Sequence, residues 1–158
     1  MRSPVVFQAK SFQLNWAPGA LVDEEHKLPS PLHAAASLGR AGTVQLLLDA
    51  GADIDRTDNV GNTPLFRAVW RGHIYMVQLL IKRGAQPNIG DTGGYTPLHV
   101  AASGHFADQS SIKLIKILIE GGADPDRGDK RGHTPIQEAR KYHNRDVVNE
   151  LLKGRTKP

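Results

Sequence analysis

The chain has 158 residues, of which 39% are hydrophobic and 23% are charged, and this composition suits one globular domain with a substantial core. The absence of cysteine excludes disulfides, thiolate metal sites and cysteine nucleophiles, and it favours a reducing compartment. No apolar run is long enough for a membrane span or a signal peptide, so we expect a soluble protein of the cytoplasm or nucleus with no membrane association.

The net charge of +4 is concentrated at one end of the chain. Residues 1–126 carry 11 Lys and Arg against 12 Asp and Glu, whereas residues 127–158 carry nine against four. Two interpretations stay open. Either the last structural unit exposes a polar surface that keeps the protein soluble, or the basic excess attracts an acidic partner or a nucleic acid.

Residues 1–28 form the first segment, and they follow no pattern that recurs later. They contain Phe7, Phe12 and Trp16 among polar residues, and Pro18 followed by glycine indicates a turn. We interpret the segment as an N-terminal arm that packs over the open apolar end of the structure that follows. The alternative is a peptide motif that a partner captures.

One motif then occurs four times. Its copies share a proline preceded by Ser or Thr and followed by Leu or Ile, and a Gly-Ala pair follows each of the first three copies. The prolines are at 31, 64, 97 and 135, and the glycines of the pairs are at 51, 84 and 122. Proline spacings of 33, 33 and 38 predict an array of repeats, in which each unit needs its neighbours to bury its apolar face.

The second copy shows the expected local structure best. Pro64 suits a first helical turn, where its missing N–H is no loss, and Gly72 closes this helix. Apolar residues at helical spacing from Ile74 to Ile81 predict a second helix, which Gly84 ends as a C-cap glycine. A turn rich in Asp, Asn and Gly leads to the next copy, so each unit is helix, turn, helix and long turn, and the expected fold is all-α.

This pattern resembles the ankyrin repeat. Residues 94–102 match its opening, Gly-x-Thr-Pro-Leu-His-x-Ala-Ala, and residues 47–53 match its close, Leu-Leu-x-x-Gly-Ala-Asp. The resemblance implies a solenoid of four stacked helix-turn-helix units with projecting finger turns, and it specifies the fold rather than a function. The expected ankyrin repeat domain is 29–158, with repeats at about 29–57, 58–90, 91–128 and 129–154.

Three departures from the ankyrin pattern are informative. Leu28 replaces the turn glycine of the first copy, and Arg140 replaces the second alanine of the last copy, as expected of capping repeats at the two ends. The third copy carries a five-residue insertion, and alignment from both sides places the extra length in a loop at 105–110, between its two helices.

Seven histidines and 16 acidic residues invite a catalytic interpretation, but their spacing does not support one. There is no histidine pair at i and i+4, no nucleophile motif, no phosphate-binding loop and no cofactor fingerprint. We therefore expect no metal, no cofactor and no enzymatic activity. The resemblance implies instead that His33 and His99 form hydrogen bonds within their turns and help to lock neighbouring repeats together.

The resemblance also implies where a partner binds. The first helices of stacked repeats line a concave groove, and side chains there and on the fingers that packing does not constrain are free for recognition. Trp70 stands out because aromatic residues dominate binding energy in interfaces, although it could instead pack against the neighbouring repeat. The expected partner-binding residues are Arg56, Asn59, Val60, Asn62, Trp70, Arg71, Thr92, Tyr95, Ser103, Lys130, Arg131, His133, Lys141 and Tyr142.

We therefore expect a monomeric protein-interaction module, an adaptor, scaffold or inhibitor, that binds another protein through the groove and finger tips. The alternative is binding of nucleic acid or another acidic surface through the basic C-terminal repeat, which predicts an affinity that falls steeply with salt. One modification is also implied, because ankyrin repeats are often hydroxylated at a finger-turn asparagine with a leucine eight residues earlier. Asn88 with Leu80 fits that arrangement.

Overall fold

The computed structural model describes residues 28–106 and 108–155, and these residues form helices and no strands. The arm expected at 1–28 lies outside the described residues except for Leu28. The helices are α2 (Pro31–Ser37), α3 (Ala41–Asp49), α4 (Pro64–Trp70), α5 (Ile74–Lys82), α6 (Pro97–Ala102), α7 (Asp108–Glu120), α8 (Pro135–Lys141) and α9 (Arg145–Arg155). No helix in this part of the chain has the length and apolar character needed to cross a membrane.

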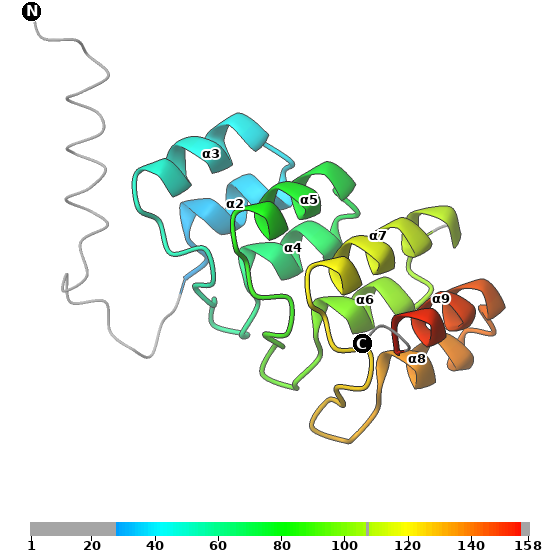
Figure 1. The fold of residues 1–158 in the computed structure, drawn as a ribbon. Helices are drawn as coiled ribbons and strands as arrows, with labels where there is room; N and C mark the ends of the chain where they lie inside the picture. Colours follow the sequence, from blue (N-terminus) through cyan, green and yellow to red (C-terminus); the bar gives the residue numbers. More distant parts are fainter. Residues whose placement is uncertain (1–27, 107, 156–158) are drawn as a thin grey trace, which may run out of the picture.

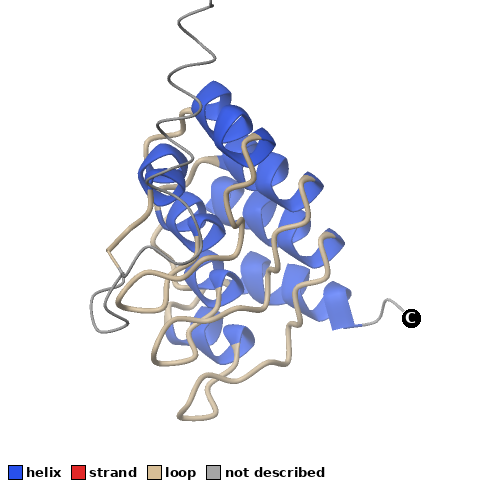
Figure 2. Cartoon of the chain, turned by 90° about the vertical axis from the view of Figure 1, so that its left-hand side faces the viewer, coloured by secondary structure: helices blue, strands red, loops and turns tan. Residues whose placement is uncertain are grey.

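The helices form two rows, and the long turns project from one side of the stack (Figure 1). In the inner row α2, α4, α6 and α8 contact one another in that order, and α5, α7 and α9 do so in the outer row. Each inner helix also packs on the outer helix that follows it in the chain. Seen along the stack, helices and projecting turns separate into distinct zones (Figure 2).

The start of each inner helix follows from its Ser-Pro or Thr-Pro pair. Thr63 is extended, with φ −85° and ψ 165°, and its Oγ1 accepts a hydrogen bond from the N–H of Phe66 at 3.1 Å. Proline directly after this cap has a φ angle suited to the helix and lacks an N–H that would have no partner there. Ser30, Thr96 and Thr134 begin the other inner helices in the same extended conformation.

The core lies between the rows and is built from equivalent positions of each repeat. The leucine or isoleucine after each motif proline is fully or almost fully buried, and so are the apolar residues of the outer helices that face inward. These residues include Leu32, Leu65, Leu98, Ile136, Val44, Val77, Ile115 and Val147. Each repeat therefore completes its core against its neighbours, as expected of a solenoid.

The insertion in the third repeat does not form the expected loop through residue 110. Helix α7 begins at Asp108 and has 13 residues, whereas α3 and α5 have nine each, so that prediction is wrong for residues 108–110. His105 and Phe106 of the insertion pack against the second repeat. The ring of His105 stacks on Trp70, and the ring of Phe106 lies against Gly72, where an added Cβ would come within 3.1 Å of it.

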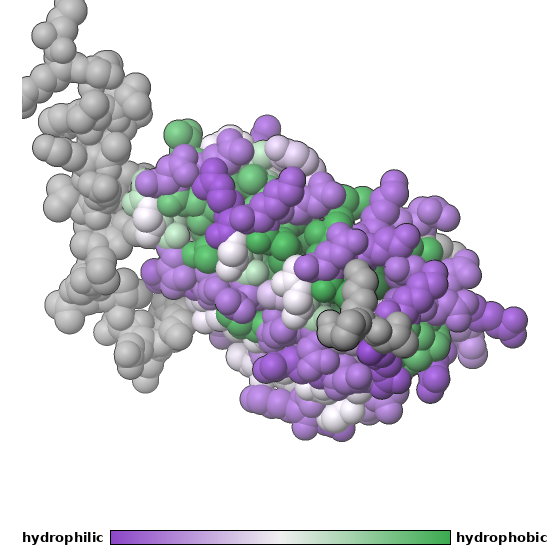
Figure 3. All heavy atoms as spheres, viewed as in Figure 1, coloured by the Kyte–Doolittle hydropathy of each residue, from purple (hydrophilic) through white to green (hydrophobic). Residues whose placement is uncertain are grey.

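The two ends of the described stack differ in character. On the last repeat, Arg140 is exposed at a position where Ala36, Val69 and Ala102 are buried in the earlier repeats, so this end is polar as expected of a cap. The first repeat instead exposes Leu38 and Leu46. In Figure 3, accordingly, hydrophilic residues predominate over the last repeats and hydrophobic ones show mainly around the first helix pairs.

Candidate functional site

Three projecting turns are built around the equivalent aspartates Asp58, Asp91 and Asp129. They open the second, third and fourth repeats and are called the second, third and fourth fingers. Asp58 Oδ1 accepts hydrogen bonds from the N–H groups of Val60 and Asn62, at 3.0 and 2.9 Å. Asp91 and Asp129 make the same pair of bonds, each to the residues two and four positions later, at 2.8 and 2.9 Å. A carboxylate that accepts two backbone N–H groups fixes the shape of the turn, which gives a rigid frame for the side chains at its tip.

Histidines of the inner helices tie each finger to the neighbouring repeat. His33 Nδ1 accepts the N–H of Ser30 at 3.0 Å, so Nε2 carries the proton and donates to the carbonyl of Asn62 at 2.8 Å. His99 repeats this with Thr96 and the carbonyl of His133, at 3.1 and 2.8 Å. Burial lowers the pKa of both imidazoles and keeps them neutral. The locking role expected of these histidines is confirmed.

An ion pair with a buried carboxylate supports the second finger. The side chain of Asp58 is fully buried, and its Oδ2 accepts hydrogen bonds from Arg67 Nε and Nη2 at 3.1 and 2.5 Å. Burial acts to raise the pKa of Asp58, but the Arg67 guanidinium and the backbone donors outweigh it and lower the pKa. The finger is therefore anchored to α4 by a carboxylate whose bonding capacity is fully used.

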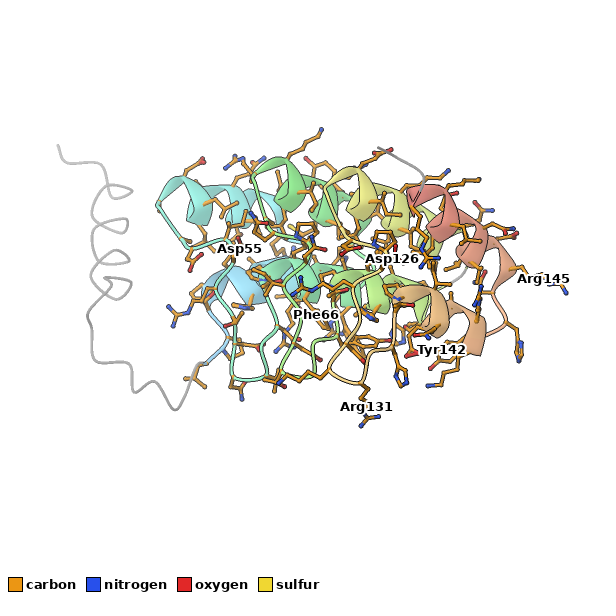
Figure 4. The ribbon with its side chains drawn as sticks, turned by 60° about the horizontal axis from the view of Figure 1, so that its bottom comes forward. Asp55, Phe66, Asp126, Arg131, Tyr142 and Arg145 are labelled. Carbon is orange, nitrogen blue, oxygen red and sulfur yellow. The ribbon has the colours of Figure 1, made fainter. Side chains whose placement is uncertain are left out.

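A hollow of about 300 Å³ lies between the second and third fingers on the side of α4. Its walls combine apolar, aromatic and polar side chains from both fingers and from the inner helix. The lining residues are Val60, Asn62, Phe66, Arg67, Trp70, Asp91, Thr92 and Tyr95. Val60 is 44% exposed and Trp70 47% exposed, whereas Phe66 is buried, so apolar surface remains open to solvent in the hollow. Figure 4 shows Phe66 between the helix rows and the fingers.

Two residues of the insertion in the third repeat, His105 and Phe106, support Trp70 at the edge of this hollow. The rings of Trp70 and His105 are stacked with centroids 5.1 Å apart, and Phe106 meets His105 edge-on at 5.2 Å. Sequence reasoning did not place His105 and Phe106 in the site. The signal available was that the extra residues contain two aromatic rings, which is a common sign of packing against a neighbour.

Tyr95 lines the hollow and also links two neighbouring repeats. Its hydroxyl donates to Glu138 Oε1 of the next repeat at 3.1 Å, and its ring lies 4.8 Å from that of His99. Burial, together with the negative charge of Glu138, raises the pKa of the Tyr95 hydroxyl. The side chain is half-buried, links two repeats and lines the hollow.

Of the predicted binding residues, the structure brings Val60, Asn62, Trp70, Thr92 and Tyr95 together around this hollow. Another group lies on the fourth finger, where Lys130, Arg131 and His133 are exposed, and Arg131 points away from the body of the protein (Figure 4).

The remaining predicted residues lie elsewhere. Asn59 is at the exposed tip of the second finger, and Arg56 is half-exposed at its base. Arg71 and Ser103 follow α4 and α6, and Lys141 and Tyr142 end α8. Their environments differ: Arg71 Nε donates to Ser37 Oγ at 3.3 Å, and Ser103 Oγ donates to the carbonyl of Val100 at 2.9 Å.

Asn88, the candidate for hydroxylation, bridges two repeats. Its Nδ2 donates to the carbonyl of Gly122 at 2.9 Å, and its Oδ1 accepts the N–H of Asp124 at 2.8 Å. Leu80 is buried in the core. Both ends of the amide are thus used in joining the second and third repeats.

Several basic residues of the C-terminal end pair with acidic neighbours. Arg155 pairs with Asp126 through Nε at 2.6 Å and through Nη2, Lys153 pairs with Glu150 at 3.3 Å, and Lys141 lies 3.9 Å from Glu138. Arg140 and Arg145 line a second hollow of about 380 Å³ on the end of the stack, where a further repeat would pack. Arg145 points outward there (Figure 4).

The described part of the chain contains no group of three or more His, Asp or Glu residues that could hold a metal ion. The arrangement of two helix rows with regular projecting fingers defines a solenoid repeat protein, and its rigid elements can hold a surface in place for another molecule.

Comparison with known proteins gives the family. A family model described as ankyrin repeats in three copies matches residues 13–91, 32–108 and 87–157. The chain belongs to the ankyrin-repeat family, whose members generally mediate protein–protein interaction. It is also similar to the ARF GTPase-activating protein Git of Drosophila melanogaster, with 49% identity over 41 residues. That match covers 26% of this chain and only 6% of the relative.

Proposed function

We propose that this chain is a protein-interaction module that binds another protein through the hollow between its second and third fingers and the surrounding groove. It would act as an adaptor, scaffold or inhibitor, as a monomer in the cytoplasm or nucleus. The absence of cysteine supports a reducing compartment. The GTPase-activating activity in the name of the relative is not carried over, because the matched segment is a small part of that protein.

The observation that supports the proposal is solvent-exposed apolar surface set in a rigid frame. Val60 and Trp70 are each nearly half exposed beside the buried Phe66, and backbone N–H groups that donate to Asp58 and Asp91 fix the fingers on both sides. An aromatic side chain in a concave setting is the typical anchor of an interface. Because the frame is ordered before binding, little conformational entropy is lost when a partner docks.

The test compares affinity capture from a cell lysate by three forms of the protein. The double variant Val60→Ser with Trp70→Ala removes the apolar lining of the hollow. The matched control, Leu46→Ala with Tyr75→Ala, removes exposed apolar side chains from the outer helices α3 and α5. Circular dichroism establishes that each form is folded.

We expect quantitative mass spectrometry to find proteins captured by wild type and control but depleted about tenfold or more with the groove variant, which corresponds to at least ~1.4 kcal/mol of binding energy. Identical capture by all three forms would remove the hollow as the binding site.

Nucleic-acid binding remains the second proposal, since the C-terminal repeat carries the basic excess. The pairing of Arg155, Lys153 and Lys141 with acidic residues argues against a single uncompensated basic face. A gel-shift titration with DNA and RNA at two salt concentrations distinguishes the proposals, because phosphate contacts would give an affinity that falls steeply with salt.

We propose separately that Asn88 is hydroxylated, because Leu80 stands eight residues before it, as in the ankyrin arrangement. The modification adds one oxygen atom, and intact-mass and peptide mass spectrometry of the protein from its native source would detect it. A spectrum without added oxygen on the peptide that contains Asn88 would overturn the proposal.

A further inference from the structure

We infer that the segment bound by this groove is an extended acidic peptide: one bulky apolar side chain fills the hollow, and acidic residues to one side of it lie along the fourth finger. The inference rests on the proposed function and specifies the chemistry of the partner. It comes from the exposed apolar and aromatic side chains of Val60 and Trp70 at the second repeat and the exposed Lys130 and Arg131 at the fourth, which make no ion pair with the described residues. We call these the apolar end and the basic end of the binding face.

The apolar end of the face is sized for a single large side chain. The hollow measures about 300 Å³, and Val60, Trp70 and Phe66 supply its apolar walls. The carboxylates near it are already engaged, because Asp58 is buried against Arg67 and Asp91 Oδ1 accepts two backbone N–H groups. The apolar part of this lining favours a leucine, isoleucine or aromatic anchor.

The basic end of the face starts at the neighbouring finger. The N–H of Lys130 donates to the carbonyl of Gly93 at 2.9 Å, which joins the fourth finger to the third, whose Thr92 lines the hollow. The side chains of Lys130 and Arg131 are exposed, and neither makes an ion pair with the described residues. They are therefore available to a carboxylate on a partner.

The nearby acidic residues do not neutralise Lys130 and Arg131. Asp129 Oδ1 accepts the N–H groups of Arg131 and His133, and its Oδ2 lies 3.7 Å from His133 Nδ1. On the neighbouring helix α8, Glu138 accepts the Tyr95 hydroxyl and lies 3.9 Å from Lys141 Nζ, so it compensates part of the charge of Lys141. Lys130 and Arg131 at the finger tip carry the positive charge that no described carboxylate pairs with.

The spacing sets the register of the peptide. Neighbouring inner helices pack directly on one another, at the roughly 8–10 Å interaxial distance of packed helices, so the fingers beside them recur at about that spacing. An extended chain advances about 3.3 Å per residue. The acidic residues should therefore lie roughly three to six residues from the apolar anchor. A peptide satisfies both ends of the face, whereas a phosphate backbone would leave the apolar hollow unfilled.

The experiment selects binders from a phage-displayed library of random dodecapeptides on the immobilised full chain and measures the affinity of the enriched peptides by fluorescence anisotropy. Charge reversal with Lys130→Glu, Arg131→Glu and Lys141→Glu tests the basic end. The matched control reverses three exposed lysines of the outer helices, with Lys82→Glu, Lys113→Glu and Lys116→Glu. The two triple variants change the net charge equally, and circular dichroism checks their folding.

We expect the enriched peptides to share one large apolar residue with at least two Asp or Glu on one side of it. The triple charge reversal at the basic end, called the groove reversal, should weaken their binding about tenfold or more, and the control reversal should weaken it less than about twofold. Peptides that require Trp70 but lack acidic residues, or that tolerate the groove reversal, would overturn this inference and leave the proposed function standing. Peptides that bind the Val60→Ser, Trp70→Ala variant as well as wild type, or no enrichment at all, would count against both.

Discussion

His33 and His99 each accept a backbone N–H at Nδ1 and donate Nε2–H to the next repeat, an arrangement that requires a neutral imidazole. Their folded-state pKa values are lowered, mainly by burial, so the unfolded chain binds more protons near its ordinary histidine pKa of about 6.5. Their contribution to stability is thus fully present above pH ~6.5 and is lost as pH falls below it. We expect the free energy of unfolding, measured in urea, to decrease from pH 7 to pH 5.

The fourth repeat shows which residue can replace these histidines in a test of the pH dependence. In the fourth repeat Gln137 holds the same position as the two histidines, and its Oε1 accepts the N–H of Thr134 at 2.8 Å. The variant His33→Gln with His99→Gln should lose about 1 kcal/mol per missing inter-repeat hydrogen bond at pH 7, yet show a flatter pH profile between 7 and 5. His143→Asn, which removes an exposed imidazole, is the control. An unchanged slope in the double variant would contradict the assignment.

Among the helical elements, the turn between α8 and α9 departs from its equivalents. Gly39, Gly72 and Gly104 have φ near +70° at this position, and the fourth repeat has His143 at φ 55°. A side chain in this left-handed region is strained, so His143→Gly should raise the free energy of unfolding by about 0.5–1 kcal/mol. His143→Ala removes the same side chain but keeps Cβ, and it should give no gain. Urea denaturation of the three proteins measures the difference, and equal stability of the glycine and alanine variants would argue against strain.

The helix starts could be predicted because each depends on local residues. A Ser-Pro or Thr-Pro pair caps and opens an inner helix wherever it occurs, and all four predicted starts are found. The beginning of α7 could not be predicted in this way. It follows His105 and Phe106, which pack on Trp70 and Gly72 of the preceding repeat, more than 30 residues earlier. Contacts of this kind depend on how repeats stack, and a local pattern of apolar residues does not contain them.

The same limit applies to the candidate site. The concave position of Trp70 and Tyr95 followed from the family pattern, but the stacking of Trp70 on His105 and the hydrogen bond from Tyr95 to Glu138 join different repeats. Net charge likewise indicated a basic C-terminal end without showing that Arg155 is paired with Asp126. Which side chains remain free for a partner is decided by these pairings across repeats.

For the molecule as a whole, a stack of repeats predicts that equal core defects have unequal effects. Leu98 of the third repeat and Leu32 of the first occupy the same motif position and are both almost fully buried. Truncation to alanine removes a similar apolar contact in each, at a cost of about 2–5 kcal/mol. However, α6 packs on both α4 and α8, whereas α2 packs on α4 alone within the described inner row. A defect at Leu98 therefore weakens two interfaces of the array, and a defect at Leu32 weakens one.

We expect Leu98→Ala to lower the urea midpoint of the whole domain, and Leu32→Ala to act mostly on the first helix pair. Hydrogen exchange followed by mass spectrometry separates these outcomes repeat by repeat. Protection should fall across α4 to α9 in the first variant but mainly in α2 and α3 in the second. If both variants lose protection evenly along the chain, the domain unfolds as one cooperative unit, and the groove formed by the second and third repeats would then depend on the integrity of the outermost helices.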